Sequence, residues 1–258
     1  MENKKCNLIS ISGKILSGKD ECVKIIQYLT SGAEEKYTYE KYKEIYNKLG
    51  EFGYGYLPEW ENKKFADKLK DMTCVLLGCN RDTLEDREFK ERPLGVEWVV
   101  YNYNNKLYDD LDLAFSDFKK FYDNSGRHNI QFEESVKDYI NKIELTPRLI
   151  LQLLGTECGR QILHPNLWVI ASFREYDCEN DKWLFSDCRF PNELKAIKER
   201  GGISIRLNRK KEIVSNIVEH ESERALDNAT FDYEINNNGT IEELIEQIRE
   251  ILIKENII

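Results

Sequence analysis

The stretch that decides the fold is Gly13-Lys14-Ile15-Leu16-Ser17-Gly18-Lys19-Asp20. It fits the phosphate-binding pattern G-x-x-x-x-G-K and departs from the usual motif only at Asp20, where Ser or Thr is common. An apolar strand is predicted just before it, over residues 7–12, and a helix just after it, over residues 19–29. In that setting the loop N–H groups point at phosphate oxygens, and the ammonium group of Lys19 neutralises charge between the β- and γ-phosphates. A chance match in an ordinary loop is the alternative, which the flanking strand and helix disfavour.

Strands and helices alternate over the C-terminal part of the chain. Thr146 and Pro147 predict the start of a helix over residues 148–162, and Thr240 with Glu243 forms a capping box for a C-terminal helix. The remaining predicted elements are helices over residues 65–77, 165–174 and 191–200 and strands over residues 182–187, 203–207 and 231–235. The alternation predicts an α/β fold of three layers, in which helices cover both faces of a parallel sheet, as in the P-loop NTPases.

Chain length leaves the number of domains open. The 258 residues suffice for one large core with insertions or for two modest domains. We expect a single domain over residues 1–258, with insertions around residues 37–64 and 96–145.

Composition excludes several classes of protein. The net charge of −9 disfavours binding to long nucleic acids, and no apolar run approaches the roughly 20 residues that span a bilayer, so a cytoplasmic protein is expected. The seven Cys residues contain no C-x-x-C pair and are expected to be buried thiols. With only three His residues, a His-rich metal site or a catalytic triad is not expected.

Three further segments follow the phosphate-binding loop in chain order. They are residues 65–70 (FADKLK), residues 148–160 (RLILQLLGTECGR) and residues 187–193 (DCRFPNE). With the loop, they resemble the deoxynucleoside monophosphate kinases of tailed bacteriophages, a branch of the P-loop kinases; residues 220–223 and 236–239 are weaker matches to the same family. In that family an Asp stands where this chain has Asp20 and a Thr follows it. Here the next residue is Glu21, which leaves the direct Mg²⁺ ligand open.

The resemblance implies transfer of the γ-phosphoryl group of ATP to a deoxynucleoside 5′-monophosphate (dNMP), with Mg²⁺ as cofactor. The insertions would then be acceptor-binding and lid-like. The implied catalytic residues are Lys19, Arg160 and Arg189, and the implied ATP-binding residues are Gly13, Lys14, Ser17, Gly18, Lys19, Asp20 and Glu21. The implied substrate-binding residues are Lys70, Arg148, Gln152, Thr156, Glu157 and Trp168, and the implied metal ligands are Asp20 and Asp187. ATP and the dNMP would be the partners, with a homodimer left open, and the setting would be nucleotide supply in a host cytoplasm.

Physical requirements agree with these roles without selecting among them. In-line transfer between two anionic substrates needs several cations to converge, which favours Lys19, Arg148, Arg160, Arg174 and Arg189. The ordinary alternatives are a surface salt bridge for Arg148 or Arg160, a solvated Lys70, a turn cap at Asp187 and a core aromatic at Trp168. Two other functions stay open, namely a P-loop kinase of another small molecule and a degenerate nucleotide-binding regulator.

Overall fold

The computed structural model describes residues 6–52, 58–124, 140–210 and 224–258. The chain forms two compact units, one made of residues 1–68 and 164–258 and the other of residues 69–163. Each unit has its own sheet.

The first unit is built on a five-stranded sheet in the order β2-β6-β1-β7-β8, and every neighbouring pair is parallel. The strands are β1 (Leu8–Gly13), β2 (Glu61–Lys63), β6 (Trp183–Phe185), β7 (Ile203–Asn208) and β8 (Tyr233–Asn236). A parallel sheet needs crossover helices, and these run along both faces. The predicted α/β class and its three layers are confirmed.

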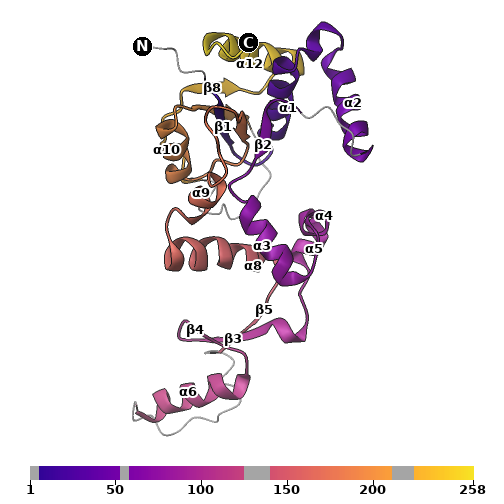
Figure 1. Ribbon diagram of the computed structural model, residues 1–258. Helices are drawn as coiled ribbons and strands as arrows, with labels where there is room; N and C mark the ends of the chain where they lie inside the picture. The colour runs from indigo at the N-terminus through magenta and orange to yellow at the C-terminus, as the bar shows by residue number, and fades with distance from the viewer. Residues whose placement is uncertain (1–5, 53–57, 125–139, 211–223) are drawn as a thin grey trace. The chain divides into compact units, whose positions relative to one another are not determined.

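Alternation along β1 separates the two hydrophobic cores of this unit. Ile9 and Ile11 pack with helix α1 (Lys19–Thr30) and helix α12 (Ile241–Lys254), whereas Leu8 packs on the other face. The helices on that other face are α9 (Leu167–Ser172) and α10 (Pro191–Glu199) (Figure 1). The 3₁₀-helix η1 (Ala33–Glu35) and the helix α2 (Tyr39–Phe52) follow α1 along the chain. Because side chains of a strand point alternately to opposite faces, one short strand joins both cores.

The second unit combines helices with a small antiparallel sheet in the order β4-β3-β5. Its strands are β3 (Val99–Tyr103), β4 (Lys106–Tyr108) and β5 (Asn141–Glu144). Within its described residues, the helices are α3 (Asp67–Leu77), which begins in the first unit, α4 (Arg81–Glu85), α5 (Arg87–Glu91), η2 (Val96–Trp98), α6 (Leu111–Asn124), α8 (Pro147–Gln152) and the π-helix η4 (Leu153–Leu163). Tyr108, Ala114, Phe118 and Ile140 form its buried apolar cluster.

Three sequence expectations differ from the structure in detail. Strand β2 lies in the stretch taken as an insertion but forms an edge of the core sheet; its three polar residues carry no alternation that could reveal it. The helix expected over residues 148–162 is α-helical only to Gln152 and then widens into the π-helix. The apolar spacing of the two helix types is too similar for the sequence to distinguish them. Among the cysteines, burial is confirmed for Cys6, Cys22, Cys74 and Cys188 and is wrong for Cys158 and Cys178, which are exposed.

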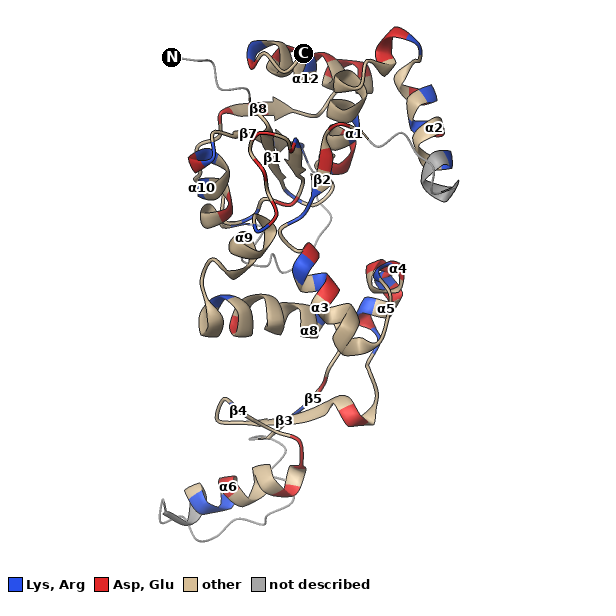
Figure 2. Ribbon diagram, in the orientation of Figure 1, with Lys and Arg blue, Asp and Glu red and all other residues tan. Residues whose placement is uncertain are grey.

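Charge is mixed on the outer helices of the first unit. Figure 2 shows acidic and basic residues interspersed along α10 and α12, as their sequences require. The apolar residues of α12 face the core, since Leu244, Ile248 and Leu252 are buried. These helices are therefore ordinary amphipathic cover for the sheet.

Candidate functional site

The loop of residues 13–20, which fits the phosphate-binding sequence pattern, lies between β1 and α1 at the carboxyl end of the sheet. Gly18 caps α1 with φ 98° and ψ 21°, a conformation that side-chain-bearing residues rarely adopt. Leu16 also has a positive φ, 65°, and its side chain is 83% exposed. The N–H of Ser17 donates to the carbonyl of Lys14 at 3.1 Å and closes the turn. The loop therefore places the start of α1, with its unsatisfied N–H groups, at the sheet edge where α/β proteins bind ligands.

Two small residues let the loop fold back closely on the sheet. A Cβ on Gly13 would lie 2.4 Å from the Ser17 Oγ and 2.8 Å from the carbonyl oxygen of Leu207. The Ser17 Oγ is itself buried, and no residue that the structure describes offers it a hydrogen bond. A buried hydroxyl without a partner is costly, and a phosphate oxygen is an acceptor that would satisfy it.

Lys19 braces the loop from inside in the ligand-free chain. Its Nζ donates to the carbonyl of Gly13 at 2.7 Å and to the carbonyl of Lys14 at 2.9 Å. Neutral carbonyls are weaker partners for an ammonium group than phosphate oxygens are. The contacts therefore hold Lys19 over the loop in a position from which it can turn to a phosphate.

A second network holds the loop from the neighbouring strand. Arg206 of β7 stands beside Ser12 of β1 and donates to its Oγ at 2.9 Å. The same guanidinium group pairs with Asp227 at 3.2 Å, and Lys14 lies 3.8 Å from that carboxylate. This network links the base of the loop to the sheet. Because only 12% of the Arg206 side chain is exposed, solvent screens its hydrogen bonds and ion pair only weakly.

The two candidate metal ligands differ in their surroundings. Asp20 is exposed in the first turn of α1. Asp187 follows β6, the neighbour of β1, and its carboxylate accepts the N–H groups of Phe65 at 2.8 Å and Ala66 at 3.1 Å. Burial raises the pKa of Asp187 above its ordinary value, against the lowering effect of these two bonds.

These surroundings fit Mg²⁺ in an outer-sphere arrangement. Mg²⁺ commonly uses one or two carboxylates together with phosphate oxygens and several waters. Asp20 is exposed to solvent. Each carboxylate oxygen of Asp187 accepts one backbone N–H group and can still accept a further hydrogen bond. Among the residues that the structure describes, no group of three or more His, Cys, Asp or Glu forms a metal cluster.

The polar residues of the segment 187–193 mostly hold the backbone. Glu193 is buried, and its Oε2 accepts the N–H groups of Arg189 at 2.8 Å and Phe190 at 3.0 Å. Asn192 donates to the carbonyl of Pro165 at 3.1 Å and so ties the start of α10 to the segment before α9. The motif thus fixes the backbone on which Arg189 is carried at the carboxyl end of β6.

Glu21 has a structural partner that the sequence did not indicate. Its carboxylate pairs with Lys43 of α2 at 3.1 Å, with both side chains partly buried. The contact directs Glu21 toward α2. Glu21 therefore contributes to the packing of α1 against α2.

Lys70, Arg148 and Arg160, three of the predicted residues in the second unit, make local contacts. Lys70 pairs with Glu85, and Arg148 pairs with Glu91 on the surface. Burial tends to raise the pKa of Glu85, but its bonds to Lys70 and Lys90 outweigh this and bring that pKa to about 2. The remaining residues of this group are Gln152 and Glu157, which are exposed, Thr156, which is half-buried, and Arg160, which donates to the carbonyl of Gly155 at 3.1 Å.

Trp168 belongs to the first unit and is only 4% exposed. Little of its ring surface is open to a base in the ligand-free chain, so stacking would require the neighbouring side chains to move. Its role in substrate binding stays a prediction. The weaker family match at residues 220–223 lies outside the described residues.

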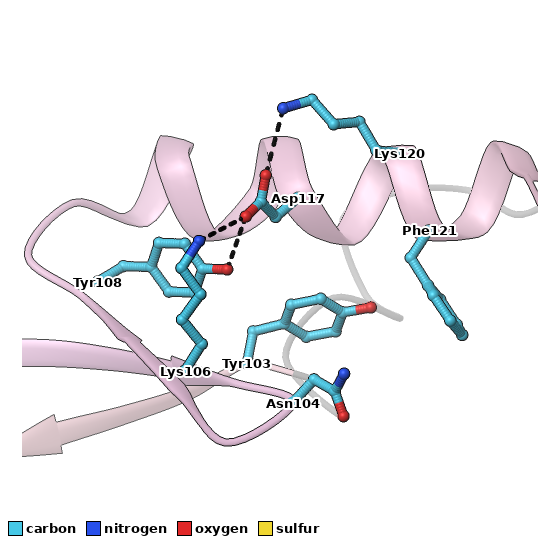
Figure 3. A pocket seen from close by; sticks show the side chains of 7 residues that line it. All are labelled: Tyr103, Asn104, Lys106, Tyr108, Asp117, Lys120 and Phe121. Carbon is cyan, nitrogen blue, oxygen red and sulfur yellow. Dashed lines mark hydrogen bonds and ion pairs between the residues drawn. The ribbon is translucent and has the colours of Figure 1, made fainter.

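A hollow in the second unit is lined by aromatic and charged residues from the β3–β4 hairpin and α6 (Figure 3). At its side, Asp117 accepts hydrogen bonds from Lys106 at 3.0 Å, Tyr108 at 2.8 Å and Lys120 at 3.2 Å. These three donors hold the pKa of Asp117 well below its ordinary value. The network ties α6 to the hairpin, which is a structural task for a small sheet with few buried residues.

Residues 7–248 match the sequence model of the deoxynucleotide monophosphate kinase family. The chain belongs to this family. Over 149 residues it is 27% identical to the deoxynucleoside-5′-monophosphate kinase of Escherichia phage T5, an alignment that covers 52% of this chain and 57% of the relative. The chain therefore matches little more than half the length of that relative. In the part of the chain that the structure describes, no helix is both long and apolar enough to span a membrane.

Sequence reasoning assigned no role to Arg206 or Asp227, and it placed Asn237 in the weakly matching segment 236–239 without foreseeing its contact with the loop. Arg206 and Asp227 form the network at its base, and Asn237 donates to the carbonyl of Ser17 at 2.8 Å. A signal existed for Arg206, a charged residue inside the apolar strand Ile203–Asn208. Asn237 is separated from Ser17 by 220 residues, so only the fold could bring them together.

Proposed function

We propose that the protein is an ATP-dependent deoxynucleoside monophosphate kinase that converts ATP and a dNMP into ADP and a dNDP. The observation that carries the proposal is the family match over residues 7–248, in a chain with a built phosphate-binding loop between β1 and α1. The unpartnered Ser17 hydroxyl and the position of Lys19 support binding of phosphate at this loop.

The proposed chemistry is in-line phosphoryl transfer, in which the protein supplies position and positive charge. Lys19 exchanges its two carbonyl partners for oxygens of the β- and γ-phosphates, and Arg160 and Arg189 stabilise charge on the transferring group. No general base is required, because the acceptor is already an anionic phosphate oxygen.

Mg²⁺ would neutralise charge on the β- and γ-phosphate oxygens when bound. Asp20 and Asp187 are the proposed residues for it, and both would act through water. Position 20 offers no hydroxyl for direct coordination, and Asp187 already accepts two backbone N–H groups.

The acceptor is proposed to bind to Lys70, Arg148, Gln152, Thr156, Glu157 and Trp168. In the ligand-free chain, Lys70 and Arg148 are paired with carboxylates that are about half exposed. Ion pairs at the surface contribute only about 0–1 kcal/mol. A dianionic phosphate can therefore displace Glu91 from Arg148 at small cost, whereas at Lys70, whose side chain is only 17% exposed, it would have to compete with a more strongly held Glu85.

A coupled ADP-release assay over dAMP, dGMP, dCMP, dTMP and modified monophosphates tests the proposal directly. ADP release that depends on at least one dNMP, above the rate without acceptor, supports it. Transfer to nucleosides or coenzyme precursors alone would assign another small-molecule kinase. ATP binding without transfer to any acceptor would assign a nucleotide-binding regulator, and both results would refute the proposed reaction.

A further inference from the structure

Asn237 directly follows β8, the last described strand in chain order, and its side chain contacts the phosphate-binding loop. Its side-chain Nδ2 donates to the carbonyl oxygen of Ser17 at 2.8 Å. Its own backbone N–H donates to the carbonyl of Asn208 at 2.8 Å, directly after the paired strands β7 and β8. The amide group is therefore held by the sheet while it holds the loop.

We propose that Asn237 is a positioning residue that aims the Gly18 N–H at the bound phosphate by fixing the Ser17–Gly18 peptide. In a trans peptide the carbonyl and the following N–H point in opposite directions. No peptide bond of the described residues is cis. A donor that holds the Ser17 carbonyl outward consequently directs the Gly18 N–H to the opposite side, toward the start of α1, where the N–H groups lack intrahelical acceptors.

The same contact explains a second demand on Gly18. Its φ of 98° already favours glycine, and a Cβ at this position would lie 2.5 Å from the Asn237 Nδ2. Any other residue at position 18 would therefore have to displace the amide group of Asn237 from the Ser17 carbonyl.

The inference rests on the proposed function only in that the loop binds phosphate. It concerns how the loop is held, and it assigns no contact between Asn237 and the nucleoside or the acceptor. Its test is therefore equilibrium binding, which does not require turnover.

Titration calorimetry with ADP and with tripolyphosphate, on the full chain, gives the first measurement. Asn237→Ala removes the donor, and Asn237→Asp keeps the shape but turns an acceptor toward the Ser17 carbonyl. Loss of one ordinary hydrogen bond corresponds to about a fivefold loss of affinity. We expect at least that loss for both ligands in both variants, and more in Asn237→Asp because of its added charge.

Asn236→Ala is the matched control, since Asn236 is the exposed neighbour in β8. It should bind both ligands like the wild type. The melting temperature of the Asn237 variants should fall by no more than about 4 °C, which is the shift that loss of one hydrogen bond causes in a chain of this size. The KM for the dNMP should stay near the wild-type value, because the contact orients one peptide and does not build the core.

Two results would overturn the proposal. Wild-type affinity for tripolyphosphate in both Asn237 variants would show that the loop does not need the contact, and a loss confined to ADP would reassign Asn237 to the nucleoside. If the wild type binds ADP with the expected variant losses but transfers phosphate to no dNMP, the proposed reaction fails and this inference stands.

Discussion

Replacing Gly18 by alanine tests the construction of the phosphate-binding loop most directly. A side chain at φ 98° costs about 2 kcal/mol of backbone strain. The new Cβ would also lie only 2.5 Å from the Asn237 Nδ2 and would displace it. The hydrogen bond from Nδ2 to the Ser17 carbonyl would then be lost, which costs about 1 kcal/mol. The more restricted unfolded chain returns about 0.5 kcal/mol, so the net loss in free energy of unfolding is about 2.5 kcal/mol.

Gly32 provides the matched control at the other end of α1. Its φ is 67°, inside the left-handed region, and a Cβ there meets no atom within 4 Å. Strain of about 1 kcal/mol is largely offset by the unfolded-state term, so Gly32→Ala should cost about 0.5 kcal/mol. The two substitutions should therefore differ by about 2 kcal/mol although their chemistry is identical.

Urea unfolding followed by tryptophan fluorescence measures the difference. Trp60, Trp168 and Trp183 are buried in the first unit, so the signal reports mainly on the unit that contains the loop. In the double variant Gly18→Ala/Asn237→Ala, the loss should be about 1 kcal/mol smaller than the sum of the single losses, because both remove the same hydrogen bond. Equal destabilisation by Gly18→Ala and Gly32→Ala, or simple additivity in the double variant, would refute the reasoning.

Three further predictions concern charge. Lys19→Ala should fold normally but lose more than tenfold in kcat, a barrier increase above about 1.4 kcal/mol, and a steady-state rate above a tenth of wild type would contradict its role. Asp187→Asn should raise the Mg²⁺ concentration needed for half-maximal rate, while ATP binding measured in the presence of a chelator stays unchanged. If the Mg²⁺ dependence is unaltered and only stability falls, the role of Asp187 is structural, through its hydrogen bonds from Phe65 and Ala66. The pKa of Glu85 falls from 4.5 to about 2 on folding, so its stabilising contribution is present above pH 4.5 and is lost as the pH falls toward 2. In acid unfolding, the stability difference between wild type and Glu85→Gln should shrink over that window, and a constant difference would exclude the ion pairs with Lys70 and Lys90 as its source.

The sequence by itself determined those features that depend on neighbouring residues. The strand, glycine turn and helix around residues 7–29 are encoded locally, as are the Thr146 cap of α8 and the capping box of Thr240 and Glu243. Turn geometry and helix caps are fixed by short-range hydrogen bonds, which is why residue type and spacing predicted them. The α/β class followed from the same local periodicities.

Tertiary structure decided the features that join distant segments. Strand β2 exists because Glu61 to Lys63 pair with β6, and no pattern in these polar residues marks them as a strand. The bond between Asn237 and Ser17 joins residues 220 positions apart, and Glu21 meets Lys43 only once α2 is placed. Such contacts depend on which strands are neighbours in the sheet and on how the helices pack against one another. A single sequence records the residues that make them, but their partners are chosen by the fold.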